Sequence, residues 1–106
     1  MNIEQNLIKK IITRILAVTQ AEKIIIFGSA ASGKMTRDSD IDLLILQSAP
    51  GDPRRESVRV RQALMDLDYP FDIIVMATER FEESKEIIGG IAYPAHKYGK
   101  VIYEAA

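Results

Sequence analysis

The chain has 106 residues, of which 47% are hydrophobic and 27% are charged, and these values indicate one small globular domain spanning residues 1–106. A net charge of −1 argues against nucleic acid as a direct partner, and the absence of cysteine excludes disulfides and thiolate metal sites. The single histidine excludes a His-based zinc site, and the short apolar runs exclude a membrane span, so we expect a cytoplasmic protein.

The first half of the chain is predicted to form a helix followed by two strands. Apolar residues at helical spacing predict a helix over residues 3–18, with Asn2 as a cap. A short β-branched run at residues 24–27, ending at Gly28, predicts a buried strand, and a short helix follows over 29–33. After a polar loop, the carboxylates of Asp40 and Asp42 open a second strand that continues through residues 43–46.

The second half alternates in the same way. A turn at 49–53 leads into a helix whose apolar side we assign to Val58, Leu64, Met65 and Leu67. Residues 71–77 predict a third strand, and residues 78–88 predict a helix that is broken at Gly89-Gly90. A last short helix over 91–98 and an edge strand over 101–103 complete an α/β (α+β) pattern, with about four strands flanked by helices.

Three carboxylates at the starts of predicted strands are the main chemical signal. Side chains two apart on a strand share a face, so Asp40 and Asp42 lie together, and Asp72 joins them if the second and third strands are neighbours. Like charges this close repel, whereas Mg²⁺ would hold such oxygens together. Alone, an Asp-x-Asp pair is explained better by Asp40 as a turn cap and Asp42 as an exposed strand end. Asp72 and the preceding Gly-Ser turn favour the metal interpretation.

Gly28 and Ser29 form the second signal. A strand that ends in glycine and enters a helix through serine presents backbone N–H groups and a hydroxyl to an anion. An ordinary turn with Ser29 as the helix cap is the alternative. Gly28, Gly33 and Lys34 also match most of the P-loop motif, but Met35 stands where that motif requires a magnesium-binding hydroxyl. We therefore reject the P-loop.

Together these residues resemble the minimal nucleotidyltransferases of the DNA polymerase β-like superfamily. The resemblance rests on three segments that cover most of the chain: Gly28-Ser29-Ala30-Ala31-Ser32-Gly33, residues 38–45 with Asp40 and Asp42, and residues 71–75 with Asp72. It implies the polymerase β-like fold, with a small mixed sheet. Many relatives carry arginines where this chain has Ala30 and Ser32, so Lys34 or Arg37 would have to supply positive charge, or else remain solvated loop cations.

The resemblance implies a magnesium-dependent transfer that uses ATP. Asp40, Asp42 and Asp72 would be the catalytic and metal-binding residues, holding two Mg²⁺ ions, and Gly28 and Ser29 would bind the nucleotide phosphates. Larger relatives carry an added acceptor domain for which this chain has no room, so we expect the acceptor to come from a partner.

Minimal nucleotidyltransferases of this size resemble antitoxins paired with HEPN-type toxins, in which AMP is transferred to a toxin tyrosine. We expect that activity here. The alternatives are a non-catalytic antitoxin that acts by complex formation, and transfer to a small molecule such as an aminoglycoside. The sequence leaves open whether the chain forms homo- or hetero-oligomers. It also leaves open whether Arg54, Arg55, Arg59 and Arg61 meet an acidic partner or simply form a solvated helix face.

Overall fold

The structure is a computed structural model that describes residues 4–36 and 38–106. The helices are α1 (Gln5–Val18), α2 (Ser29–Ser32), α3 (Pro53–Ala63), α4 (Thr78–Ser84) and α5 (Ala92–Tyr98). The strands are β1 (Lys23–Phe27), β2 (Ile41–Gln47), β3 (Phe71–Ala77) and β4 (Lys100–Glu104). Within the described residues no helix is long and apolar enough to cross a membrane.

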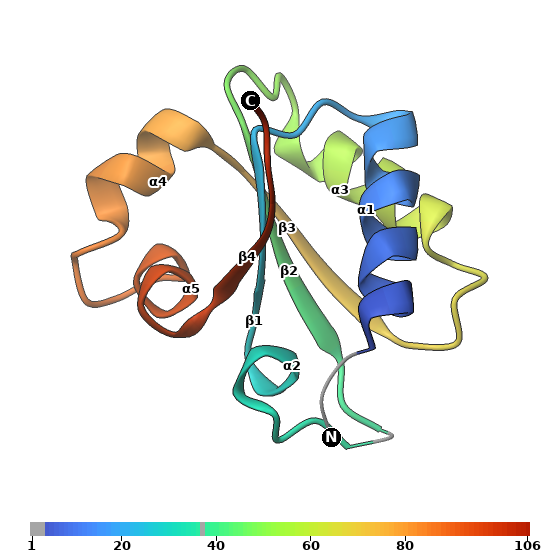
Figure 1. Cartoon of the computed structure of the whole chain (residues 1–106). Helices are drawn as coiled ribbons and strands as arrows, with labels where there is room; N and C mark the ends of the chain where they lie inside the picture. Colours follow the sequence, from blue (N-terminus) through green and yellow to red (C-terminus); the bar gives the residue numbers. More distant parts are fainter. Residues whose placement is uncertain (1–3, 37) are drawn as a thin grey trace.

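The four strands form one mixed sheet in the order β3-β2-β1-β4. β1 is antiparallel to both β2 and β4, whereas β2 and β3 run parallel. The predicted mixed sheet and the edge position of the last strand are confirmed, and the condition that the second and third strands be neighbours is met. The parallel pair brings the starts of β2 and β3 to the same end of the sheet, beside α2 (Figure 1).

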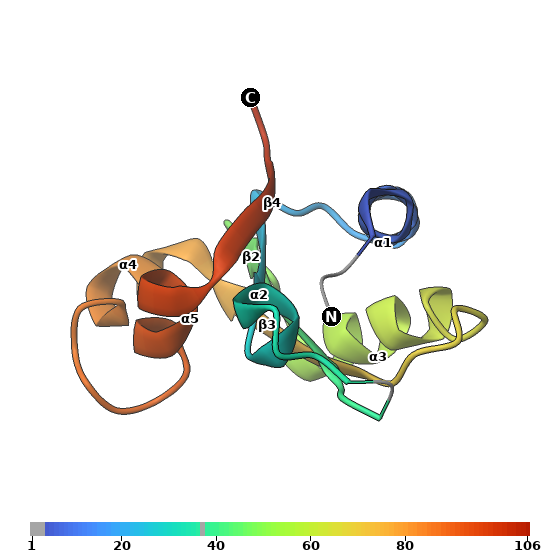
Figure 2. The same cartoon turned by 60° about the horizontal axis from the view of Figure 1, so that its bottom comes forward.

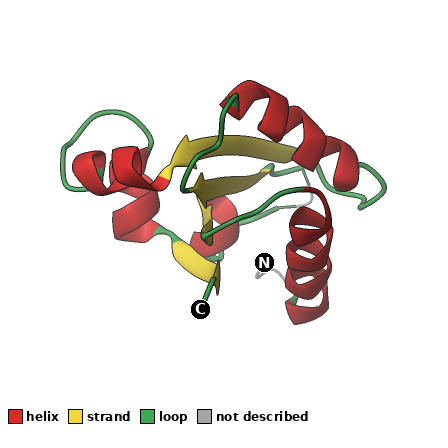
Figure 3. Ribbon diagram, turned by 90° about the horizontal axis from the view of Figure 1, so that it is seen from above, coloured by secondary structure: helices red, strands yellow, loops and turns green. Residues whose placement is uncertain are grey.

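Helices cover both faces of the sheet, which gives three layers (Figures 1 and 3). On the α1 and α3 side, Ile11 and Ile15 of α1 and Val60 and Leu64 at α3 pack against strand residues such as Leu43. The α4 and α5 side has a second core, made of Ile25, Phe27, Leu44, Leu46, Phe81, Ala92 and Ala95. Alternate β2 residues therefore serve opposite cores, as the side-chain alternation of a strand requires.

Two helix predictions were wrong in detail. α4 ends at Ser84 and not near residue 88, and Ile87 and Ile88 are 63% and 81% exposed. The positions three and four beyond buried Phe81 are Ser84 and Lys85, so no apolar stripe continues the helix against the sheet.

Val58 of α3 and Met65, just beyond the end of this helix, are exposed, contrary to the prediction. Leu64 is buried and Leu67 packs against the same core, as predicted, and Val60, four residues before Leu64, is buried with them. At the start of α1 the predicted cap, Asn2, lies outside the described residues. Glu4 occupies the cap position and makes no side-chain capping bond.

Candidate active site

The residues singled out from the sequence meet at one end of the sheet. Gly28 follows the last residue of β1, Asp42 is the second residue of β2, and Asp72 is the second residue of β3. When this end of the sheet is turned toward the viewer, α2 lies at the front, before the strands (Figure 2).

The sheet register sets Asp42 between two neighbours. Asp42 pairs with Asp72 on the parallel side and with Phe27 on the antiparallel side. Adjacent strands lie about 4.8 Å apart, so the two carboxylates start from neighbouring backbone positions. Leu44 follows Asp42 by two residues and belongs to the α4 and α5 core, so the carboxylate of Asp42 projects on that face. By the same alternation from Ile74, Asp72 projects on that face too.

A hydrogen bond at the start of β2 fixes this register. The N–H of Ile41 donates to the carbonyl of Pro70 at 2.9 Å, which aligns the first residues of β2 and β3. The loop before it is closed by Thr36 and Ser39, whose backbone and hydroxyl groups bond at 2.9–3.1 Å.

Asp40 lies just outside the strand, because β2 begins at Ile41. Strand alternation therefore does not orient its exposed side chain, and the prediction that Asp40 and Asp42 share a face stays a prediction.

The electrostatics tie the three carboxylates together. Partial burial raises the pKa of the Asp42 carboxyl above its usual range, and the negative charges of Asp72 and Asp40 raise it further. Asp40 and Asp72 are exposed, whereas Asp42 is half-buried. Of the three carboxylates, Asp42 is therefore the one whose ionised form a bound cation would stabilise most.

Gly28 packs directly against Asp42, which the sequence did not reveal. Its φ of 67° and ψ of −149° lie in a region that only glycine adopts readily. A Cβ at this position would overlap the Asp42 Oδ2 oxygen and lie 3.3 Å from Asp42 Cγ. The absence of a side chain at Gly28 therefore leaves room for the Asp42 carboxylate, in addition to its predicted role of letting a phosphate approach.

Ser29 is the first residue of α2, and Gly28 is the cap residue, so the suggestion that Ser29 caps the helix was wrong. The N–H groups of Ala31 and Ser32 bond to the Gly28 carbonyl at 3.2 Å. The earlier N–H groups, of Ser29 and Ala30, are those that a helix start leaves for an outside acceptor. Met35 is only 2% exposed and belongs to the core, in agreement with the rejection of a P-loop.

The helix that follows Gly28 carries no cationic side chain. α2 contains only Ser and Ala, and Ala30 is buried to 4% exposure, so this position has little room for a longer side chain. Lys34 is exposed just beyond α2, and Arg37 lies outside the described residues. The four arginines Arg54, Arg55, Arg59 and Arg61 are exposed on α3, which covers the opposite face of the sheet from the one to which Asp42 projects.

The donor chemistry of the trio suits a hard divalent cation, because all three ligands are carboxylate oxygens. The shared electrostatic field at Asp42 is the observation that supports this fit. Across residues 4–36 and 38–106, no three His, Cys, Asp or Glu side chains already stand together as a metal-binding group. The exposed side chains of Asp40 and Asp72 would therefore have to rotate toward Asp42 to share an ion.

The mixed sheet, the layered helices and the Asp pair beside a Gly-Ser turn define the class of nucleotidyltransferase domains. The chain belongs to the polymerase beta nucleotidyltransferase family, whose family model matches residues 9–105. No curated protein matches the sequence.

Solved structures show the same fold. The chain is similar to a toxin–antitoxin structure with AMP-PNP at 20% identity and a TM-score of 0.66, covering 92% of this chain and 73% of that one. A Sulfolobus solfataricus protein assigned as a nucleotidyltransferase is 20% identical with a TM-score of 0.63, covering 93% and 78%. A structure of tri-AMPylated Shewanella oneidensis HEPN toxin in complex with MNT antitoxin is 18% identical with a TM-score of 0.55, covering 96% and 74%. At these identities the similarity establishes the fold.

Proposed function

We propose that this protein is an antitoxin that transfers AMP from ATP to a tyrosine hydroxyl of a HEPN-type toxin. The observation that carries the proposal is the placement of Asp42 beside Asp72, with Gly28 packed against Asp42. The proposal is supported by two of the similar structures, one containing AMP-PNP and one containing an AMPylated HEPN toxin.

Asp40, Asp42 and Asp72 are the residues that would hold two Mg²⁺ ions. Bound there, the ions would lower the pKa of the acceptor hydroxyl and neutralise charge on the departing pyrophosphate. The half-buried Asp42 would link the two other ligands, because it is paired with Asp72 in the sheet and the charge of Asp40 raises its pKa.

The remaining roles follow from position. Asp72 lies on β3, one of the two edge strands, and is exposed, so it can orient an incoming tyrosine hydroxyl or accept its proton. The backbone N–H groups that open α2 and the hydroxyl of Ser29 would bind the phosphates of ATP. A side chain at Gly28 would overlap the Asp42 carboxylate, so glycine keeps the space beside Asp42 clear.

A non-catalytic antitoxin that silences its partner by binding alone is the second candidate. It is favoured by α2, which contains only Ser and Ala and so brings no cation to the phosphate-binding turn. In that case Asp40, Asp42 and Asp72 would have no catalytic role.

Both candidates can be tested with one set of reactions. The HEPN-type protein encoded beside this chain is incubated with it, ATP and magnesium, and pyrophosphate release and complex formation are both measured. Pyrophosphate release that depends on the partner and is lost in Asp42→Asn and Asp72→Asn supports the transferase. A stable, silenced complex without pyrophosphate release contradicts the transferase and supports the binding module.

A further inference from the structure

The end of α5 lies close to the carboxylate end of the sheet. Gly99 follows α5, and Lys100, the first residue of β4, pairs with Ile26 of β1. Asp42 pairs with Phe27, the next residue of β1, so β4 and β2 flank this strand at nearly the same level. Because adjacent strands are spaced by about 4.8 Å, the start of β4 lies about 10 Å from Asp42 across the sheet. Figures 1 and 2 both show α5 near α2 at this end.

Gly99 fixes the end of α5 against β1. A Cβ at this glycine would lie 2.7 Å from Ile25 Cγ2 and 3.0 Å from the Ile26 carbonyl oxygen, so no side chain separates the two elements. The Gly99 N–H donates to the Ala95 carbonyl at 3.0 Å, and Ala95 is buried in the core on the α4 and α5 side. The last turn of α5 is therefore held on the face of the sheet to which Asp42 projects.

Tyr98 is the last residue of α5 and the most exposed of the four tyrosines. It is 64% exposed, whereas Tyr69, Tyr93 and Tyr103 are half-buried. Tyr69 and Tyr103 pack against the core on the α1 and α3 side, which is the opposite face from the one to which Asp42 projects. Tyr98 is thus the tyrosine that combines an exposed ring with a place on the carboxylate face.

A lysine lies beside the Tyr98 ring. The Lys97 ammonium is 5.4 Å from the centre of the Tyr98 ring and 5.5 Å from that of Tyr93, and it donates a hydrogen bond to the Tyr93 hydroxyl at 3.1 Å. These contacts hold a positive charge next to Tyr98, where it would attract an anion such as a triphosphate. The helix α2, on the other side of β1, supplies no such charge.

We propose that the Tyr98 hydroxyl accepts AMP within the same molecule, so that the chain modifies itself when it holds ATP without a partner. The inference rests on the proposed function, because the transfer uses the same carboxylates and the same kind of acceptor, a tyrosine hydroxyl. ATP bound at the Gly28–Ser29 turn would bring its α-phosphate between Asp42 and the end of α5.

The step has the same balance as transfer to a partner. The Tyr98 oxygen forms a bond to the α-phosphorus of ATP, and the bond between that phosphorus and the oxygen bridging to the β-phosphorus breaks. Pyrophosphate leaves with the bonding electron pair, and the hydroxyl proton passes to the exposed carboxylate of Asp72 and then to water. The product carries AMP on Tyr98 through a phosphodiester bond.

The test is the intact mass of the purified full chain after incubation with ATP and magnesium, in the absence of a partner. We expect an increase of one AMP unit, and peptide mass spectrometry should place it on Tyr98. Tyr98→Phe should stay unmodified but still transfer AMP to a HEPN-type partner. Tyr103→Phe is the matched control, because it removes a tyrosine hydroxyl on the opposite face, and it should gain AMP like the wild type.

A mixture of two variants shows whether the transfer stays within one molecule. Tyr98→Phe keeps the three carboxylates but lacks the acceptor, whereas Asp42→Asn keeps Tyr98 but lacks one of the carboxylates. We expect neither chain to gain AMP when the two are mixed with ATP and magnesium. AMP on the Asp42→Asn chain would show transfer between molecules and would contradict the proposal.

Two further results would overturn the proposal. These are a chain that stays unmodified while it transfers AMP to the partner, and AMP on a residue other than Tyr98. If neither the chain nor the partner gains AMP, the transferase function fails and self-transfer fails with it. Measuring both masses therefore distinguishes failure of self-transfer from failure of the proposed function.

Discussion

Replacing Gly28 by alanine tests whether this glycine keeps Asp42 in place. Residue 28 has φ 67° and ψ −149°, and a non-glycine residue in that region costs about 1–3 kcal/mol. For a domain of this size, each kcal/mol lowers the Tm by about 4–8 °C. The added Cβ would also overlap Asp42 Oδ2 and lie 3.3 Å from Cγ, so the whole carboxylate must move and not merely rotate. Displacement of a reacting group by about 1 Å can cost about 100-fold in rate.

Gly51 provides a matched control. Its φ is 69°, yet a Cβ there would have nothing within 4 Å. Gly51→Ala should therefore lose stability through backbone strain, as Gly28→Ala does, while its transfer rate stays within about twofold of wild type, since residues away from the site have little effect. The assay is AMP transfer to the HEPN-type partner, measured below the Tm of both variants, alongside thermal unfolding.

One result would contradict a role for the Gly28–Asp42 contact in the reaction. If Gly28→Ala and Gly51→Ala lose similar stability and both keep the wild-type transfer rate, the contact between Gly28 and Asp42 has no role in the reaction. A loss of transfer in Gly28→Ala alone is the result that the structure predicts.

Three further predictions concern stability. Burial and then the charges of the other carboxylates raise the pKa of Asp42, so its contribution to stability is lost as the pH rises through that pKa. Asp72→Asn should thus raise the free energy of unfolding at pH 7 by about 1 kcal/mol or less, because Asp72 is exposed, and the gain should vanish in acid; a lower Tm at pH 7 would contradict this. Two side-chain hydrogen bonds lower the pKa of Glu56, so its stabilisation is present above the ordinary glutamate pKa of about 4.3 and is lost as the pH falls through the lowered value. Glu56→Gln should unfold more easily than wild type at pH 7, with a difference that shrinks below about pH 4; a pH-independent difference would count against it. Leu44→Ala in the core should cost about 2–5 kcal/mol in denaturant unfolding. Met65→Ala, at a 74% exposed position, should stay within about 0.5 kcal/mol, and a larger loss would mean that Met65 is buried in solution.

Much of the fold could be predicted because strand patterns and stop signals are local. The runs at residues 24–27 and 71–77 are rich in β-branched or apolar residues. Gly28 follows the first run and Pro70 precedes the second, and the runs form β1 and β3 within one residue of the predicted bounds. Helix faces were harder, because a short helix with few apolar residues has more than one plausible buried side. Leu64 was predicted correctly as a core residue, whereas Val58 and Met65 are exposed and Val60, which was not predicted, is buried.

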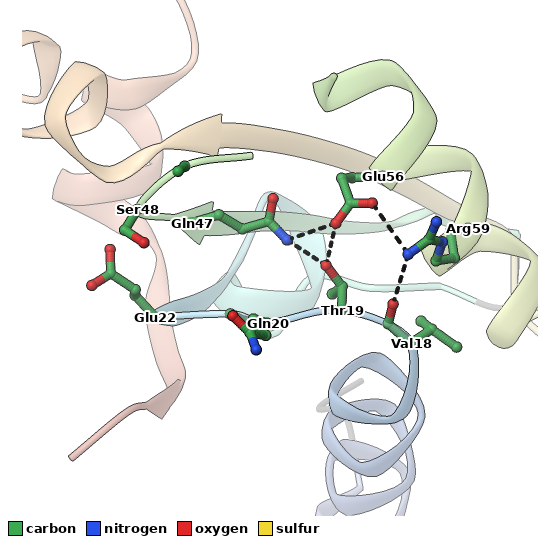
Figure 4. Close-up of a pocket in the computed structure, with 10 residues that line it drawn as sticks. Val18, Thr19, Gln20, Glu22, Gln47, Ser48, Glu56 and Arg59 are labelled. Carbon is green, nitrogen blue, oxygen red and sulfur yellow. Dashed lines mark hydrogen bonds and ion pairs between the residues drawn. The ribbon is translucent and has the colours of Figure 1, made fainter. Parts of the chain in front are cut away.

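The site could be predicted in its composition but not in its contacts. The carboxylates Asp42 and Asp72 were expected to meet, and the parallel register pairs them. No sequence signal showed that Gly28 packs against Asp42, because that contact depends on the register of β1 and β2. The hydrogen bonds that Gln47 donates to Thr19 and Glu56 (Figure 4) were not predicted either, because they join residues far apart in the sequence.

The intact mass of a HEPN-type partner, after reaction with this chain, ATP and magnesium, decides whether the carboxylates support AMP transfer. We expect a mass increase of one or more AMP units on the partner, and no increase when Asp42→Asn replaces the wild type. A partner that keeps its original mass with wild-type chain, or gains AMP equally with Asp42→Asn, would contradict the assignment of transfer to these carboxylates.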